Sequence, residues 1–144
     1  MNLYICTMVQ KDSIIALATP SGIGAISVIR ISGEDAIDIL SKFFVSKSGK
    51  LLKNQKTHTI HLGNIINNTQ IIDEVLVSVF KNPRSYTGEN VVEISCHGSS
   101  FIQQEIIQLL LRKGCRMATA GEFTLQAFLN CRFFLILQRF LCSL

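Results

Sequence analysis

The segment from Ser85 to Gly98 constrains the fold of this chain more than any other. Its middle, Val91 to Cys96, predicts a β-strand, because β-branched residues alternate there between glycines that end the pattern on both sides. One face of this strand holds Val92, Ile94 and Cys96, and the other holds Val91, Glu93, Ser95 and His97. We expect the first face to be core. After Gly98 a helical pattern begins at Ser100, and the free N–H groups of a helix start often form binding sites.

The other predicted elements follow from the same kind of pattern. Strands are expected at 13–18, 24–33, 57–66 and 71–80, and helices at 34–44, 100–111 and 123–130. The third and fourth strands form a hairpin through the turn at 67–70. Capping boxes are expected at Ser100/Gln103 and at Thr119/Glu122. The fold class is therefore α/β (α+β), a mixed β-sheet with packed helices.

Strand 24–33 is apolar on both faces, which predicts a central strand covered on both sides. Arg30 lies in the middle of this strand and therefore needs an anion nearby. Glu93, in the middle of the strand 91–96, is a carboxylate in a similar position. The two could form a structural ion pair or belong to a ligand site, and strand geometry alone leaves both interpretations open.

Composition limits the class of protein. With 144 residues, 48% of them hydrophobic and 17% charged, the chain is expected to be one globular domain. The net charge of +4 is spread along the chain without interleaved aromatics, so we do not expect this chain alone to bind nucleic acid. No stretch reaches membrane-spanning length, and the start of the chain lacks the basic region of a signal peptide.

The cysteines and histidines show neither the spacing of a metal site nor that of a nucleophilic catalytic site. Five cysteines without metal-ligand spacing favour reduced, mostly buried thiols and a cytoplasmic protein. His58 and His61, three apart on a strand, point to opposite faces and cannot share a metal ion. His97 is expected to be a turn former or a satisfied histidine, and no catalytic residue is predicted.

An ordered set of short motifs carries a resemblance. The set consists of Arg30-Ile31-Ser32-Gly33, Ile72-Asp73-Glu74-Val75, Ser85-Tyr86-Thr87-Gly88-Glu89, Val92-Glu93, His97-Gly98, Gly121-Glu122-Phe123-Thr124 and Ala127-Phe128-Leu129-Asn130. It closely resembles the N-terminal domain of the tRNA-modification GTPases of the MnmE, or TrmE, family. The match runs from about Ser13 to Asn130, nearly the whole chain.

The resemblance implies a domain that binds 5-formyl-tetrahydrofolate or a related one-carbon tetrahydrofolate and forms a homodimer. Its fold is similar to that of the folate-binding aminomethyltransferase of glycine cleavage. By motif position, the family's folate contacts fall on Arg30, Glu93 and Arg132. Tyr86-Thr87-Gly88 is expected to shape the loop, with the alternative that Tyr86 flanks a pterin ring. In the full-length family, GTP, potassium, an MnmG-type flavoprotein and tRNA take part in modifying C5 of the wobble uridine. The resemblance implies no membrane partner.

The chain also departs from the family pattern. No G-x-x-x-x-G-K-[ST] motif is present, so this chain alone is not expected to hydrolyse GTP. Gln126 stands where the family usually has a basic residue. We expect an N-terminal extension at 1–12, the family domain at 13–130 and an atypical tail at 131–144. Ten of the fourteen tail residues are apolar, which suggests a frameshift near residue 131 or, alternatively, a native apolar helix.

Two functions from different classes follow from these observations. The first is a one-carbon-folate-binding and dimerisation domain of a tRNA-modification enzyme. The second is a dimerisation scaffold whose folate site is defective. Saturable binding of folate separates the two.

Overall fold

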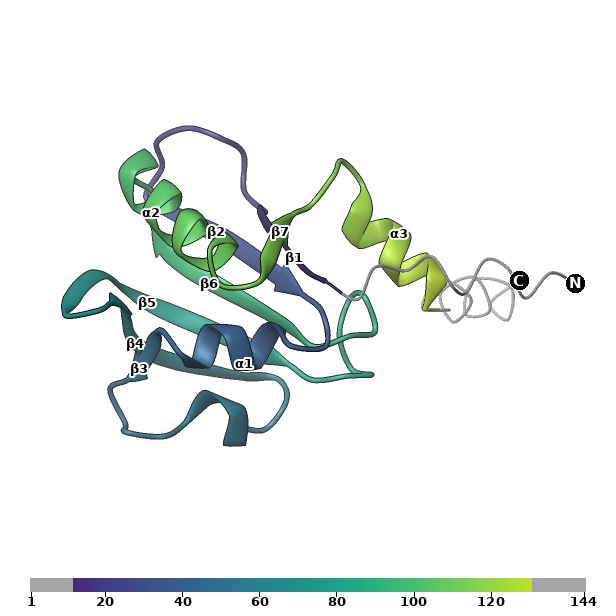
Figure 1. Cartoon of the computed structure of the whole chain (residues 1–144), viewed down its shortest axis with the longest axis horizontal. Coiled ribbons are helices and arrows are strands. Elements are labelled where there is room, and N and C mark those ends of the chain that lie inside the picture. The colour runs from purple at the N-terminus through teal and green to yellow at the C-terminus, as the bar shows by residue number, and fades with distance from the viewer. Residues whose placement is uncertain (1–11, 131–144) are drawn as a thin grey trace, which may run out of the picture.

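The computed structural model describes residues 12–130, which form a seven-stranded sheet with three α-helices (Figure 1). The strands are β1 (Ser13–Leu17), β2 (Ile26–Ser32), β3 (Phe44–Ser46), β4 (Thr59–Asn67), β5 (Gln70–Phe80), β6 (Val91–His97) and β7 (Cys115–Met117). The helices are α1 (Ala36–Ser41), α2 (Ser100–Leu111), α3 (Glu122–Leu129) and the short 3-10 helix η1 (Leu52–Asn54). The predicted α/β class is confirmed.

The sheet is mixed, with the strand order β3-β4-β5-β6-β2-β1-β7. All neighbours are antiparallel except β1 and β7, which run parallel. The predicted hairpin of β4 and β5 is confirmed, and its turn contains Asn68 in the left-handed region with φ 55°. The two longest strands, β4 and β5, are neighbours, and β5 pairs on its other side with β6, which in turn pairs with β2.

Helices α1 and α2 cover one face of the sheet and enclose the core between them and the strands (Figure 1). The expected core face of β6 is confirmed, since Val92 and Ile94 are fully buried and Cys96 is nearly so. Leu40 of α1 and Ile106 of α2 are also fully buried in this core. Alternation along each strand thus sends one set of side chains to the helices and the other set to the opposite face.

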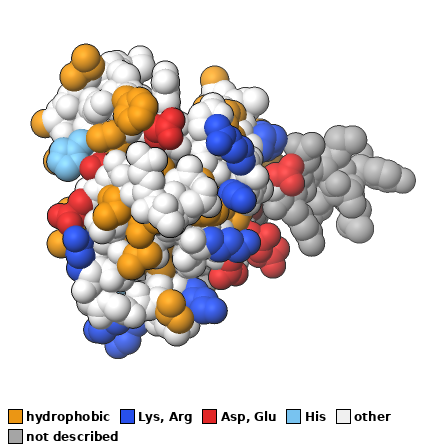
Figure 2. All heavy atoms as spheres, turned by 60° about the vertical axis from the view of Figure 1, so that its left-hand side comes forward, with side chains coloured by type: hydrophobic (Ala, Val, Ile, Leu, Met, Phe, Trp, Pro, Cys, Tyr) orange, Lys and Arg blue, Asp and Glu red, His pale blue; other side chains and the backbone are white. Residues whose placement is uncertain are grey.

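The prediction that β2 is covered on both sides is wrong. On the face opposite α1 and α2, Ile26 is 66% exposed, as are Ile60 of β4 at 66% and Leu76 of β5 at 46%. The space-filling view in Figure 2 shows hydrophobic side chains, in orange, at several separate places on one side of the molecule, between charged side chains. We call the sheet face opposite α1 and α2 the open face. At one end of β2 and β6, Ser32 and Val91 on this face are buried.

Several local predictions were too simple. The expected helix 34–44 ends at Ser41, because Phe44 begins strand β3 against β4. The predicted capping box of α2 is wrong: Gln103 instead donates from Nε2 to Ser27 Oγ at 2.7 Å and to the Gly22 carbonyl at 3.2 Å. Before α3 only half of the predicted box forms: Glu122 accepts the Thr119 backbone N–H at 2.7 Å, but the Thr119 side chain does not cap the helix, which begins after Gly121.

The predicted extension and tail lie outside the described residues, apart from Asp12, and so does Arg132. Within 12–130, no helix is both long enough and apolar enough to cross a membrane. Cys96 and Cys115 are free, buried thiols, as expected for reduced cysteines.

Candidate functional site

Arg30 and Glu93 face each other across the open face. They are register partners on the antiparallel strands β2 and β6. Arg30 Nε donates to Glu93 Oε1 at 2.8 Å, and Arg30 Nη2 lies 2.7 Å from the same oxygen. The side chains keep 29% and 25% of their exposure, so solvent and ligands can reach both. The expectation that Arg30 has an anionic neighbour is confirmed, and Glu93 is that neighbour.

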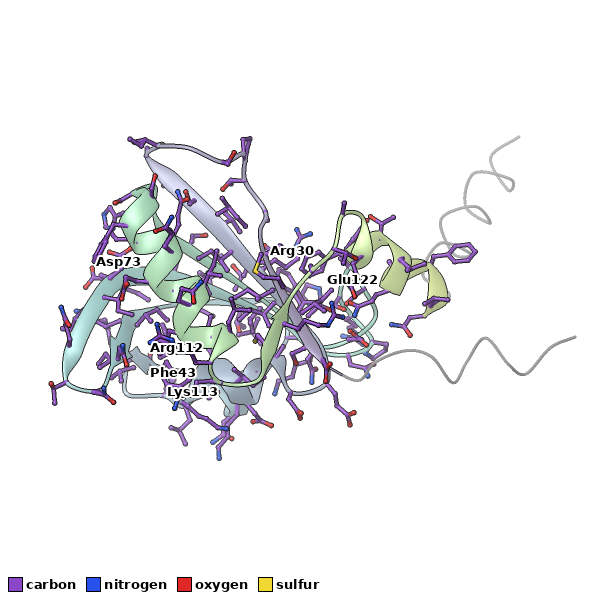
Figure 3. All side chains as sticks on the ribbon, turned by 45° about the horizontal axis from the view of Figure 1, so that its top comes forward. Arg30, Phe43, Asp73, Arg112, Lys113 and Glu122 are labelled. Carbon is purple, nitrogen blue, oxygen red and sulfur yellow. The ribbon has the colours of Figure 1, made fainter. Side chains whose placement is uncertain are left out.

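Two aromatic rings flank the guanidinium of Arg30. Its Cζ lies 5.6 Å from the ring centroid of Tyr86 and 5.6 Å from that of Phe123, both within cation–π range. Tyr86 belongs to the loop between β5 and β6, and Phe123 to α3. The Tyr86 hydroxyl is 3.1 Å from Thr124 Oγ1, which joins that loop to α3. Figure 3 labels Arg30 in the sheet and Glu122 at the start of α3.

Within the described part of the chain, the ion pair leaves hydrogen-bonding capacity on both side chains unused. Both contacts from Arg30 go to Oε1 of Glu93, and no residue within 12–130 donates to Oε2. Arg30 Nη1 likewise has no described acceptor. Among the described residues, one carboxylate oxygen of Glu93 and one guanidinium nitrogen of Arg30 are therefore without a partner, while the pair itself is intact. This arrangement can accept from and donate to one polar, planar ligand at the same time.

A buried polar network fixes the loop between β5 and β6. Ser32 Oγ and Thr87 Oγ1, both on fully buried residues, are 2.7 Å apart, and Ser32 Oγ donates to Glu89 Oε2 at 3.1 Å. Burial raises the pKa of Glu89; the Ser32 hydrogen bond lowers it, and the nearby charge of Glu34 adds to the rise. Asn130 Nδ2 donates to the Thr87 carbonyl at 2.8 Å, which ties the end of α3 to the same loop.

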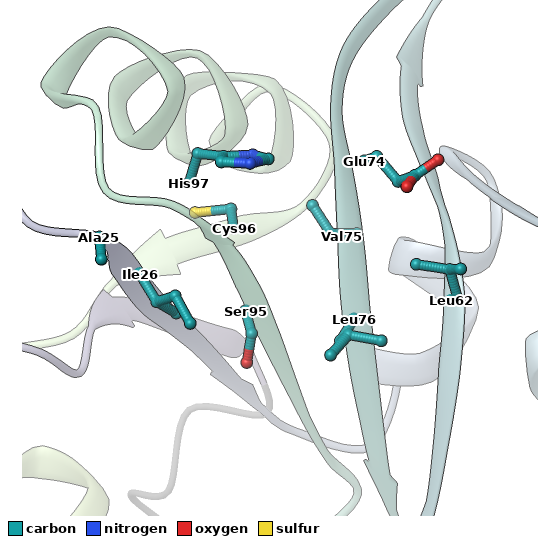
Figure 4. Close-up of a pocket in the computed structure, with 9 residues that line it drawn as sticks. All are labelled: Ala25, Ile26, Leu62, Glu74, Val75, Leu76, Ser95, Cys96 and His97. Carbon is teal, nitrogen blue, oxygen red and sulfur yellow. The ribbon is translucent and has the colours of Figure 1, made fainter.

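The far end of β6 has a second polar contact. Asp73 accepts the His97 backbone N–H at 2.9 Å and lies 2.7 Å from His97 Nδ1, so His97 is a satisfied histidine as expected. Beside it lies a largely apolar pocket, drawn in Figure 4 with Ser95, Cys96 and His97 at one wall. Burial, with a further contribution from the Asp73 charge, raises the pKa of Cys96 to about 11.

These groups form no catalytic constellation. A thiol with such a pKa stays protonated at neutral pH and is a poor nucleophile. Within residues 12–130, no group of three His, Cys, Asp or Glu side chains could hold a metal ion.

Of the three residues predicted for the site, the structure brings Arg30 and Glu93 together, and Arg132 lies outside the described part. The sequence reasoning did not assign Phe123 to the site. Phe123 directly follows the capping-box residue Glu122, which is a signal for a helix start but not for a contact with β2. Its role depends on how α3 is placed against the sheet.

Comparison with known proteins bears on this site. A family model described as GTP-binding protein TrmE N-terminus matches residues 13–132. The chain is 68% identical over 123 residues to a tRNA modification GTPase MnmE of Flavobacterium johnsoniae, covering 85% of this chain and 26% of the relative. It is 62% identical over 125 residues to that of Christiangramia forsetii, covering 87% and 26%. The chain thus spans about a quarter of the length of these relatives. Because the family model covers most of its residues, the chain belongs to the family of TrmE (MnmE) N-terminal domains.

Proposed function

We propose that this domain binds a one-carbon tetrahydrofolate, 5-formyl-tetrahydrofolate or a close relative, as part of a tRNA-modification enzyme. The observation that carries the proposal is the Arg30–Glu93 pair, which is accessible, is flanked by two aromatic rings and has a carboxylate oxygen to which no residue in 12–130 donates. A purely structural ion pair needs neither accessibility nor free donors and acceptors, whereas a ligand site needs both.

The chemistry of a pterin matches these groups. A pterin presents a ring N–H and an exocyclic amino group side by side, and a carboxylate such as Glu93 can accept from both in a charge-assisted pair. Arg30 then donates to the pterin carbonyl or to carboxylates of the ligand. Tyr86 lies over Arg30 and would flank the ring. Arg132 is proposed as a third contact on the strength of the family resemblance alone.

The wider setting is also proposed from the relatives, whose printed name is tRNA modification GTPase MnmE. We propose that the domain forms a homodimer in the cytoplasm. In the full-length protein it would act with an MnmG-type flavoprotein on the wobble uridine of tRNA, with GTP and potassium bound elsewhere. The exposed apolar side chains Ile26, Ile60 and Leu76 of the open face support an assembly, because such surface gains free energy when it is covered.

Calorimetric titration with 5-formyl-tetrahydrofolate tests the folate proposal. The wild-type chain should bind saturably, and Glu93→Gln should weaken binding by roughly 30- to 1000-fold, equivalent to about 2–4 kcal/mol for a lost charge-assisted contact. Its melting temperature should change little. The matched control is Glu105→Gln, which makes the same change on the exposed side of α2 and should bind as the wild type does.

Two outcomes would contradict this proposal. A Glu93→Gln protein that is unfolded or strongly destabilised would make Glu93 primarily the structural partner of Arg30. A wild-type dimer that binds no folate would favour the alternative function, a dimerisation scaffold with a defective folate site.

A further inference from the structure

Four lysines gather at one corner of the molecule, beside the end of β5. Lys50, Lys53 and Lys56 lie in the segment around η1 and are exposed, and the half-buried Lys81 directly follows β5. Lys81 Nζ donates to the Lys53 carbonyl at 2.9 Å, so the ammonium group of Lys81 lies against η1. Along the sequence these cations belong to two separate segments, and the fold brings the segments together. We call the four residues the lysine corner.

The backbone beneath the lysine corner is held in place. Leu52 of η1 is buried in the hydrophobic core. Thr57 Oγ1 accepts the Lys81 backbone N–H at 2.9 Å, and Thr59 Oγ1 donates to the Lys56 carbonyl at 2.6 Å. The flexible lysine side chains therefore start from a fixed backbone, which keeps their charges in one region of the surface.

No acidic side chain neutralises the lysine corner. The sequence has no acidic residue between Asp38 and Asp73 or between Glu74 and Glu89. Asp38 of α1, the helix that packs against η1, is exposed but is not paired with any of the four lysines. Within residues 12–130, none of the four forms an ion pair at all. The local potential is therefore positive and attracts a polyanion.

The lysine corner lies at the same end of the sheet as the candidate site. Phe80, the last residue of β5, is the register partner of Val91, the first residue of β6. Glu93 is two residues further along β6, and Lys81 directly follows Phe80. A polyanion bound at the lysine corner would thus lie near the end of the sheet at which Arg30 and Glu93 meet.

We propose that the lysine corner binds the phosphate backbone of tRNA. The inference rests on the proposed tRNA-modification function and adds the surface of this domain that holds the RNA. A lysine ammonium group acts as a point charge toward a phosphate, and each phosphate that is neutralised releases counterions. Such contacts position a nucleic acid without reading its sequence. They would bring the tRNA to the end of the sheet at which the one-carbon folate is proposed to bind.

Fluorescence anisotropy of a labelled tRNA transcript, titrated with the whole chain in about 50 mM salt, tests this assignment. We expect weak binding, with a dissociation constant on the order of 10–100 µM, that weakens steeply as the salt concentration rises. The double variant Lys53→Gln and Lys56→Gln should bind about 10-fold more weakly. It should also lower the slope of log K against log salt by about 1.5 to 2, because two phosphate contacts are lost.

The matched control is the double variant Arg112→Gln and Lys113→Gln. It removes the same charge at two exposed residues just after α2, both labelled in Figure 3. This control should bind tRNA within about 2-fold of the wild type, since at moderate salt distant charges are largely screened. If the control and the Lys53/Lys56 variant lose tRNA binding equally, net charge rather than the lysine corner holds the RNA, and the assignment is wrong.

Titration of the same variants with 5-formyl-tetrahydrofolate separates this proposal from the folate proposal. The Lys53/Lys56 variant should bind folate as the wild type does, because the Arg30–Glu93 pair is unchanged in it. If the wild type binds folate but no tRNA at low salt, the lysine corner is wrong while the folate proposal stands. If the wild type binds tRNA through the lysine corner but no folate, the folate proposal fails while the RNA surface stands.

Discussion

Glu122 and Arg116 form a two-point ion pair that joins the start of α3 to β7, the strand at one edge of the sheet. Arg116 Nη2 lies 2.6 Å from Glu122 Oε1, and Nη1 lies 3.1 Å from Oε2. The same carboxylate accepts the backbone N–H and the hydroxyl of Thr119 at 2.7 Å and 3.1 Å. Phe123, which lies beside Arg30, therefore directly follows the residue that anchors α3, Glu122.

This anchor predicts a loss of stability in acid. The Arg116 hydrogen bond holds the pKa of Glu122 at about 2, below its ordinary value of 4.5. A carboxyl with a lowered folded-state pKa stabilises the fold above pH 4.5, and that contribution disappears as the pH falls from 4.5 to about 2. Glu122→Gln should therefore lower the free energy of unfolding at pH 7 by about 1–2 kcal/mol, after allowing for solvent screening of the partly exposed pair.

Chemical denaturation at a series of pH values measures this. The difference between wild type and Glu122→Gln should be largest at pH 7 and close to zero near pH 2. An equal difference at both pH values would show that the carboxylate charge contributes nothing.

Glu89 should behave in the opposite way. Burial raises its pKa in the folded state, so folding favours the protonated form and the ionised form is disfavoured at neutral pH. Glu89→Gln keeps an oxygen that can accept from Ser32 and removes the buried charge. Its melting temperature at pH 7 should equal or exceed that of the wild type, and the difference should vanish below pH 4. A lower melting temperature at pH 7 would contradict this.

Gly98, at the turn from β6 toward α2, is expected to tolerate no side chain. A Cβ there would overlap the carbonyl of Gly24, whose N–H donates to the Gly98 carbonyl at 3.0 Å. Backbone atoms must move to relieve this overlap, so Gly98→Ala should cost about 1–3 kcal/mol of stability. The control is Gly24→Ala, since a Cβ at that position meets only the Ile26 carbonyl at an ordinary 3.7 Å. Equal unfolding free energies for the two variants would refute the argument.

Arg30 should be replaceable for folding but not for binding. Arg30→Lys keeps a positive charge beside Glu93 but loses the planar group between Tyr86 and Phe123 and one of its two donors to the carboxylate. We expect folate affinity to fall by about 10-fold or more, with a melting temperature within a few degrees of the wild type. Calorimetry and thermal denaturation on the same sample measure both quantities. Unchanged affinity would remove Arg30 from the site.

Assembly can be checked by light scattering. The proposed homodimer should be present at micromolar concentration, because the open face exposes Ile26, Ile60 and Leu76. A clean monomer at that concentration would contradict the proposal. Ending the chain at Asn130 should improve solubility if the apolar tail is aberrant and reduce it if the tail is a native packing element.

The local elements could be read from the sequence because each depends on near neighbours in the chain. Alternation of β-branched residues predicted a strand from Val91 to Cys96, which the structure extends to His97, and turn residues predicted the hairpin of β4 and β5. The spacing of Thr119 and Glu122 determined the contact at the start of α3 in the same way. The need of Arg30 for an anion was also clear from its position in an apolar strand.

The tertiary structure alone decided which groups meet. Glu93 is 63 residues from Arg30 in the chain, and only the pairing of β2 with β6 makes them register partners. The same holds for Tyr86 and Phe123 around Arg30, and for Gln103, which bonds to Ser27 rather than capping its own helix. The open face was missed because an apolar pattern shows that a side chain can be buried, but not which element covers it. Coverage depends on where α1 and α2 pack, and both pack on one side of the sheet.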